Sequence, residues 1–320
     1  MILNKKNFFL NLKNNFLSEN NPSIAVGVSG GPDSIALIYL MNMWIKLKKG
    51  NLVALIIDHK IRIESYDESK KIKNYLTTLN IQSKIIRVPD KKLNKRNMNE
   101  ARINRYEKLM NYCIKNNILH LFLGHHFDDN IETFLIRKIA GSNIEGLGAM
   151  KFFSIRKNIQ IVRPLLNYTK KQIINFNKLN NLKFIQDPSN TDDQYTRIKI
   201  RNFLRTTSKI QIIKKDFNQI NYYIPLYQLM INEILNIITL KLEKKLISIS
   251  FKDFNKLNIS IKAQLIEKIY LYFYQNKKKI RFSKIMIFLD KLNGDNKIYY
   301  NLSTMNIRKS EKFLDFSIIS

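Results

Sequence analysis

The residues with the most specific chemical spacing form a turn near the N-terminus, Ser-Gly-Gly-Pro-Asp-Ser at residues 29–34. Apolar runs at residues 24–28 and 35–40 flank it and predict a buried strand before the turn and a helix after it. Adjacent glycines let the backbone approach a ligand closely, and the N–H groups at a helix start bind anions. The carboxylate of Asp33 would repel a phosphate unless a divalent cation lay between them. The turn therefore predicts a pyrophosphate site that also holds magnesium through Asp33.

A simpler explanation is a glycine bend with two serines that cap a helix. The spacing differs from Gly-x-x-x-x-Gly-Lys-Ser/Thr and from Gly-x-Gly-x-x-Gly, the two common phosphate-binding motifs. Six specified positions between a strand and a helix favour the anion site. The turn resembles the PP-loop of ATP pyrophosphatases, which split ATP into AMP and pyrophosphate while adenylating a substrate. Its expected ATP-binding residues are Ser29, Gly30, Gly31, Pro32, Asp33 and Ser34.

A second polar stretch, residues 124–133, follows another apolar run and contains two histidines and three acids. If a helix begins near Phe127, Asp129 and Glu132 share one face of it and His125 lies just before it. Capping alone explains acids at a helix start, at about 0.3–1 kcal/mol each, but it leaves His125 and Glu132 unexplained. We therefore take His125, Asp129 and Glu132 as candidate catalytic residues.

Arg102 and Arg105 lie three residues apart in a predicted helix over residues 98–116, so they share a face. Lysine is the commoner basic residue in this chain, yet arginine occurs at both of these positions. Arginine makes planar, bidentate contacts with phosphate that lysine cannot make. A basic face exposed to solvent explains the pair as well. Both arginines are candidate catalytic cations.

The formal net charge is +30, from 55 Lys and Arg against 25 Asp and Glu. Such a charge indicates a polyanionic partner, with nucleic acid first and an anionic membrane surface second. Part of it reflects a composition crowded with Lys, Asn and Ile. A basic helix over residues 195–205 is either part of the nucleic-acid surface or simply solvated. The candidate contacts are Arg201, Arg205, Lys277, Lys278 and Lys279.

A single cysteine, Cys113, excludes an internal disulfide and any Cys-x-x-Cys site. A reducing, cytoplasmic location is the default for such a chain. The first twenty residues carry no secretory signal pattern, and the most apolar window, residues 222–240, keeps a polar face. We therefore expect no association with a membrane.

Five apolar runs alternate with helical patterns up to about residue 205, namely residues 24–28, 52–57, 83–88, 120–124 and 159–162. This alternation predicts an α/β fold, a Rossmann-like domain with a parallel sheet and helices on both faces. Beyond it we expect helices over 219–246, 259–275 and 282–292, then two short strands at 297–302 and 312–318. The predicted domains are a catalytic domain, residues 1–215, and a small α+β domain, residues 216–320.

The whole set of motifs resembles the tRNA(Ile)-lysidine synthetases, a family within the PP-loop ATPases. The matching stretches are 29–34, 58–65, 100–106, 124–133, 140–147, 163–166, 187–190 and 201–202. The chain departs from the family at Ala140 and Asn143, where Arg-Gly-Ser-Gly is common. The C-terminal domain resembles the family's first tRNA-binding appendage, and we expect no counterpart of the second.

This resemblance implies a reaction. ATP adenylates the C2 oxygen of the wobble cytidine in tRNA(Ile) with a CAU anticodon, and free L-lysine then displaces AMP through its ε-amine to leave lysidine. It implies that Ser29–Ser34 hold the pyrophosphate and Mg²⁺, and that Arg102 and Arg105 neutralise charge near the reacting phosphate. His125, Asp129 and Glu132 would surround the cytosine, and which acid accepts the amine proton stays open.

Two other functions remain to be weighed. A sulfur-transferring tRNA enzyme of the PP-loop class usually needs a pair of cysteines, and this chain has one. A basic RNA-binding protein with a decayed nucleotide site would not need intact motifs at 29–34 and 124–133. The sequence leaves open whether the chain forms a homodimer.

Overall fold

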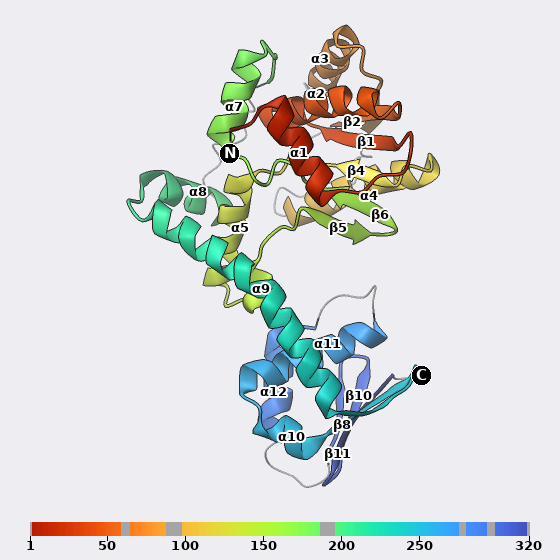
Figure 1. Ribbon diagram of the computed structural model, residues 1–320, viewed down its shortest axis with the longest axis vertical. Helices are drawn as coiled ribbons and strands as arrows, with labels where there is room; N and C mark the ends of the chain where they lie inside the picture. Colours follow the sequence, from red (N-terminus) through yellow and green to blue (C-terminus); the bar gives the residue numbers. More distant parts are fainter. Residues whose placement is uncertain are drawn as a thin grey trace. The chain divides into compact units, whose positions relative to one another are not determined.

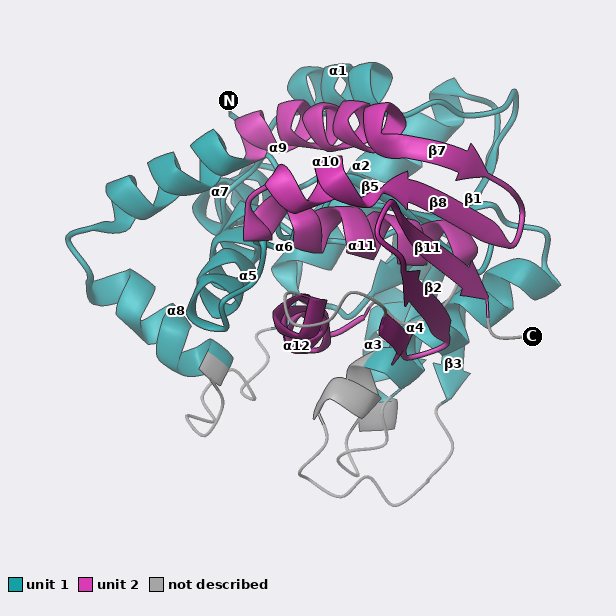
Figure 2. Cartoon of the chain, turned by 90° about the horizontal axis from the view of Figure 1, so that it is seen from below, with its two compact units in different colours: residues 1–220 teal, residues 221–320 magenta. Residues whose placement is uncertain are grey.

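The computed structural model describes residues 2–58, 65–87, 98–185, 196–274, 280–292 and 298–318. The chain forms two compact units, residues 1–220 and residues 221–320 (Figure 2). The boundary between them falls inside one helix, α9 (Ile210–Ile238), as does the predicted boundary at 215 and 216. Among the described residues, no helix is both long enough and apolar enough to cross a membrane.

A six-stranded sheet forms the centre of the first unit, and β1, β2, β4, β5 and β6 are labelled in Figure 1. Its strand order is β3-β2-β1-β4-β6-β5. All neighbouring pairs are parallel except β5 and β6. The strands are β1 (Ser23–Val28), β2 (Asn51–Asp58), β3 (Ser83–Arg87), β4 (His120–Phe122), β5 (Phe153–Arg156) and β6 (Ile159–Val162). The predicted parallel sheet is confirmed, and the strand order reverses between β1 and β4, where ligands bind in such sheets.

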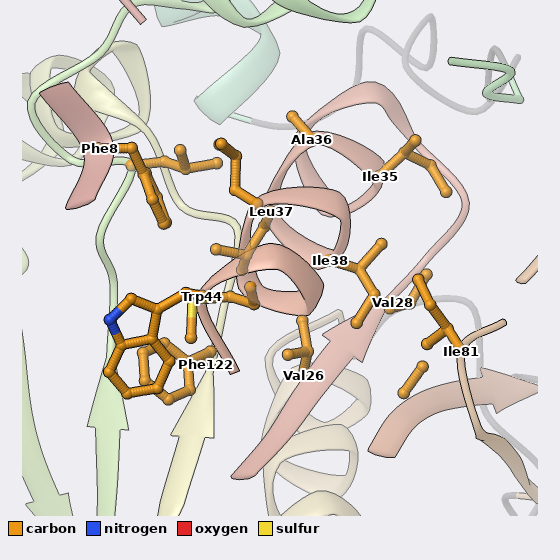
Figure 3. Close-up of a cluster of buried hydrophobic side chains, with 14 of the residues drawn as sticks. Phe8, Val26, Val28, Ile35, Ala36, Leu37, Ile38, Trp44, Ile81 and Phe122 are labelled. Carbon is orange, nitrogen blue, oxygen red and sulfur yellow. The ribbon is translucent and has the colours of Figure 1, made fainter. Parts of the chain in front are cut away.

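Helices cover both faces of this sheet, as predicted. One face packs against α1 (Lys5–Asn15), α2 (Pro32–Leu47), α3 (Ser65–Thr78) and α7 (Lys170–Leu179), and the other against α4 (Met98–Lys115). Figure 3 shows the first core, where Trp44 of α2 and Phe122 of β4 lie among aliphatic side chains. This covering explains why the strands are nearly continuous apolar runs.

A third set of helices packs beside the sheet within the first unit. These helices are α5 (Phe127–Ile139), the single turn α6 (Ile144–Leu147), α8 (Thr196–Thr206) and the first part of α9. Phe134 of α5 and Phe217 of α9 meet edge to face, with ring centroids 5.5 Å apart. This small core fixes α8 against α5, which brings its arginines to the polar stretch at residues 124–133.

The second unit is a five-stranded antiparallel sheet, β7-β8-β11-β10-β9, with helices on one face. The strands of this sheet are β7 (Thr239–Leu242), β8 (Leu246–Ser250), β9 (Ile298–Leu302), β10 (Met305–Lys309) and β11 (Phe313–Ile318). The helices are α10 (Phe251–Lys256), α11 (Ile259–Phe273), α12 (Phe282–Leu292) and the last part of α9. The α+β class is confirmed. The predicted helix over 219–246 was wrong beyond Ile238, where the chain turns into the β7–β8 hairpin, and β10 was not predicted.

Candidate active site

The Ser29–Ser34 turn joins β1 to α2, as predicted. Gly30 has a φ of +81°, and a Cβ there would lie 2.6 Å from Cδ1 of Ile72. Gly31 is the N-cap of α2 and Pro32 is its first residue. The positive φ favours glycine at position 30, since another residue would be strained there and would displace the Ile72 side chain. The turn presents the start of α2 to the ligand side of the sheet.

Ser34 holds the turn in this shape. Its Oγ accepts a hydrogen bond from the Ser29 N–H at 3.2 Å and donates one to the Gly31 carbonyl at 3.0 Å. The two serine hydroxyls lie 3.3 Å apart. The first N–H groups of a helix have no partners within the helix, so the turn is a preformed anion site.

The loop after β4 lies directly against this turn. A Cβ on Gly124 would lie 3.1 Å from the carbonyl carbon of Asp33, so glycine permits the contact. Two residues further on, His126 caps α5 in a reciprocal capping box with Asp129. The His126 N–H donates to Asp129 Oδ2 at 3.1 Å, and the Asp129 N–H donates to His126 Nδ1 at 3.4 Å. The capping explanation for Asp129 thus holds, together with further contacts.

Asp129 lies among histidine and arginine side chains. Burial on its own would raise the pKa of Asp129, but nearby His126 and His125, the His126 N–H and Arg197 together lower the pKa below its ordinary value of 3.8. An Arg197 guanidinium nitrogen lies 3.5 Å from Asp129 Oδ1. The carboxylate is therefore ionised at neutral pH and suited to hold a cation.

Glu132 is almost completely buried, with 3% of the residue exposed. Arg197 Nε donates to its Oε2 at 2.8 Å, and Arg201 Nε donates to its Oε1 at 2.7 Å. The hydrogen bond to Glu132 raises the pKa of Arg201 above its usual value. Arg201, which was predicted to contact tRNA, thus binds the candidate catalytic acid Glu132. Arg197 binds the same carboxylate, although it was not among the predicted site residues.

The ammonium of Lys170 contacts the predicted magnesium ligand. Lys170 Nζ lies 2.6 Å from Asp33 Oδ2, and the imidazole Nε2 of His126 lies 3.8 Å from Asp33 Oδ1. Sequence reasoning missed Lys170, because it stands 137 positions from Asp33 within an ordinary capping pattern, Thr169 to Gln172. The only signal in the sequence was a base in the first turn of a helix, where acids are preferred.

His125 lies beside Tyr106 of α4. The two rings are parallel within 5°, with centroids 6.5 Å apart, and the Tyr106 hydroxyl lies 3.3 Å from His125 Nε2. The guanidinium of Arg156, on β5, lies over the Tyr106 ring, 5.7 Å from the ring centroid. Tyr106 itself belongs to the buried core against α4, so its contact with the half-buried His125 fixes the position of that imidazole.

The remaining predicted site residues belong to α4, to α8 and to the second unit. Arg105 is exposed on α4 and Arg205 is exposed on α8. The backbone of Arg102 is helical, but its side chain is outside the described part of the structure, as are Lys277, Lys278 and Lys279. Their proposed contacts remain predictions.

Asp33 fits a divalent cation that it would share with phosphates. Within the described residues, its Oδ1 is buried and makes no hydrogen bond. No group of three or more His, Cys, Asp or Glu side chains in that part of the chain is arranged to hold a metal ion alone. Mg²⁺ is commonly held by one or two carboxylates together with substrate phosphates, so one half-buried carboxylate beside an anion cradle suits it.

The parallel sheet, the glycine turn after β1 and the acidic helix start after β4 define a PP-loop ATPase fold and site. An ATP-binding family model described as the PP-loop domain matches residues 4–208. A tRNA(Ile)-lysidine synthase from Wolbachia pipientis wMel is 33% identical over 94% of this chain and 71% of its own length. One from Orientia tsutsugamushi is 36% identical, over 62% of this chain and 45% of its own length.

A solved structure, the U34-tRNA thiolase NcsA from Methanococcus maripaludis with its [4Fe-4S] cluster, matches with a TM-score of 0.56. It is 19% identical, over 68% of this chain and 79% of its own, and so supports the fold alone. The chain belongs to the PP-loop family and, within it, to the tRNA(Ile)-lysidine synthases. It spans less than half the length of the Orientia relative that it matches.

Proposed function

We propose that this chain is an ATP-dependent carbon–nitrogen ligase that converts the wobble cytidine of tRNA(Ile) with a CAU anticodon into lysidine. The observation that carries this proposal is the match to a tRNA(Ile)-lysidine synthase along 94% of the chain. In the first step the cytidine C2 oxygen attacks the α-phosphorus of ATP and pyrophosphate leaves. In the second the lysine ε-amine attacks C2, and AMP leaves with the former C2 oxygen.

The nucleotide half of the site is the Ser29–Ser34 turn. Its backbone N–H groups and hydroxyls bind the pyrophosphate part of ATP, and Asp33 holds Mg²⁺ through the oxygen that makes no hydrogen bond in the described structure. The cation supplies charge neutralisation on the phosphates. Arg102 and Arg105 on α4 add positive charge near the α-phosphate.

The base and amine half of the site is the start of α5. The imidazole of His125, positioned by Tyr106, is the ring on which the cytosine can stack. Asp129, which its lowered pKa keeps ionised, is suited to pair with the lysine ammonium. The amine must lose a proton before it attacks, and Asp129 and Glu132 are the two candidate acceptors. Arg197 and Arg201 keep the Glu132 carboxylate oriented.

The tRNA is held by positive charge, with Arg205 on α8 and Lys277–Lys279 in the second unit as proposed contacts. The second unit, within residues 216–320, acts as the tRNA-binding domain. Because ATP, tRNA and free lysine meet in the cytoplasm, we place the reaction there.

Sulfur transfer is not favoured. The one thiol in the chain, Cys113, is buried in the α4 core, and burial raises the pKa of Cys113 to about 12. A thiol that stays protonated at neutral pH neither forms a persulfide readily nor binds a metal cluster. A tRNA-binding protein without catalysis is not favoured either, because the turn and the acidic helix start are both in place.

The test is incubation of the chain with ATP, Mg²⁺, labelled lysine and a tRNA(Ile) transcript with the CAU anticodon. We expect label in the tRNA and one AMP per lysine. The matched control is the same transcript with a UAU anticodon, which should stay unlabelled. Tight tRNA binding without label would instead indicate a binding protein.

A further inference from the structure

Lys170, the first residue of α7, contacts the carboxylate that the proposed function gives to Mg²⁺. We propose that Lys170 is a movable cation of the pyrophosphate site. It neutralises Asp33 while the nucleotide is absent and moves to the β- and γ-phosphates when Mg²⁺ and ATP bind. This inference rests on the nucleotide half of the proposed function and not on the tRNA half.

The main chain of Lys170 is fixed between the two halves of the site. Its N–H donates to Asp128 Oδ2, on α5, at 2.6 Å. Further along α7, the fully buried side chain of Asn177 donates from Nδ2 to the carbonyl of Pro32, in the first turn of α2, at 2.8 Å. The helix is thus attached to both α5 and α2, so a change of partner falls to the Lys170 side chain.

Helix stability does not explain a lysine at this position. The start of α7 is capped by Thr169 and Gln172, whose side chains and backbone N–H groups bond reciprocally. A positive charge in the first turn is disfavoured by the helix dipole, and this turn contains two lysines and no acid. The charge of Lys170 therefore serves the group that it contacts, Asp33.

Loading of the site would weaken this contact. A divalent cation on Asp33 Oδ1 would neutralise the carboxylate and repel the ammonium 2.6 Å from Oδ2. The phosphates bring the compensating negative charge to the neighbouring turn. Lysine is a compact charge on a flexible stem and 37% of this side chain is exposed, so it can change partners where an arginine fork could not.

The consequence for the reaction concerns the leaving group. When the bond between the α-phosphorus and the bridging oxygen breaks, its electron pair goes to pyrophosphate. An ammonium on the β- and γ-phosphates neutralises that added charge through a charge-assisted hydrogen bond. Arg197 and Arg201 do not take this role, because both are bonded to Glu132.

The test is calorimetric titration of the full chain with inorganic pyrophosphate and, separately, with AMP, both in the presence of Mg²⁺. Wild type is compared with Lys170→Met, Lys170→Arg and the control Lys171→Met, an exposed lysine in the same turn. We expect Lys170→Met to weaken pyrophosphate binding by about tenfold or more, as for the loss of a charged hydrogen bond. AMP affinity and the Lys171→Met variant should be unchanged, and Lys170→Arg should keep part of the affinity.

Equal weakening of pyrophosphate and AMP binding, or no weakening, would overturn the inference, because a purely structural role of Lys170 predicts that pattern. If Lys170→Met does not fold, Lys170→Gln replaces it in the comparison. Failure of wild type to bind pyrophosphate would overturn the nucleotide site and the proposed function with it. Normal wild-type binding that is insensitive to Lys170→Met would remove only the role of Lys170.

Discussion

Arg201 of α8 and Glu132 of α5 are joined by two hydrogen bonds, from Nε to Oε1 at 2.7 Å and from Nη2 to Oε2 at 3.2 Å. Arg197, one helical turn earlier, reaches the same carboxylate at 2.8 Å. The fork geometry of arginine matches a carboxylate in this way. Two arginines therefore hold one buried acid at the place where the lysine amine is proposed to react.

This relationship predicts a stability effect. Arg201→Ala leaves a buried carboxylate oxygen short of a partner, which costs about 1–3 kcal/mol of unfolding free energy. Urea unfolding measures it. The control is Arg205→Ala, exposed on the same helix, which should change the free energy of unfolding by less than about 0.5 kcal/mol. Equal effects of the two variants would contradict the role of the pair.

The glycine turn predicts a difference between two glycines. Gly30 and Gly141 both have positive φ, but a Cβ would collide with Ile72 only at Gly30 and would meet nothing within 4 Å at Gly141. Gly141→Ala should cost about 1–2 kcal/mol from its left-handed backbone alone. Gly30→Ala should cost more and should also abolish binding of an ATP analogue with an α,β-methylene bridge, measured by calorimetry. Retained binding in Gly30→Ala would show that the turn does not hold the phosphates.

The lowered pKa of Asp129 predicts a pH dependence. Because the pKa of the folded state lies below the ordinary value of 3.8, the ionised carboxylate stabilises the fold above that pH, and this contribution disappears as the pH falls through the folded-state pKa. The difference in unfolding free energy between wild type and Asp129→Asn should therefore be largest near neutral pH and shrink below about pH 4. Urea unfolding from pH 7 to pH 3 checks it, and a constant difference would refute it.

Asp33→Ala should separate catalysis from tRNA binding. The variant lacks the proposed Mg²⁺ ligand, so we expect no AMP or pyrophosphate to be released from labelled ATP. Affinity for the tRNA, measured by filter binding, should stay close to that of wild type, because the carboxylate adds no positive charge to the surface. Joint loss of both would contradict this division of roles.

The lysine cluster of the second unit predicts a salt effect. Neutralising Lys277, Lys278, Lys279 and Arg281 should weaken tRNA binding and flatten its dependence on salt by about 0.9 per lost phosphate contact on duplex RNA, or about 0.7 on single strands. The control is neutralisation of Lys6 and Lys13, exposed on α1. An unchanged salt slope would remove the cluster from the interface.

The parts of the structure that local patterns encode could be predicted from the sequence. Buried parallel strands are continuous apolar runs, and the turn at Gly30 requires a residue that accepts positive φ, so both leave clear signals. The hairpins formed by β5 and by β7 with β8 were missed. The strands β7 and β8 are only four and five residues long. Thr239–Leu242 also continues the spacing of apolar residues in α9, so the spacing alone does not distinguish a strand from a helix there.

The placement of the candidate residues could be predicted better than their contacts. Asp33, His125, Asp129 and Glu132 follow two strands that end at the same edge of the sheet, and the sequence patterns indicate this placement. Their partners Lys170, Arg197 and Arg201 come from helices far along the chain. Such pairings depend on how α7 and α8 pack, which no local spacing reveals in a chain rich in lysine.

Because residue 124 is glycine, the main chain of the β4–α5 loop packs directly against the main chain of Asp33. The proposed binding places for ATP and for the RNA base are therefore separated only by these two main-chain segments. With no side chain between the β4–α5 loop and the first turn of α2, a shift of either segment must move the other. Loading the triphosphate would then set the position of the groups that meet the RNA base. A side chain at position 124 would push the β4–α5 loop away from the first turn of α2 and so separate the two halves of the site.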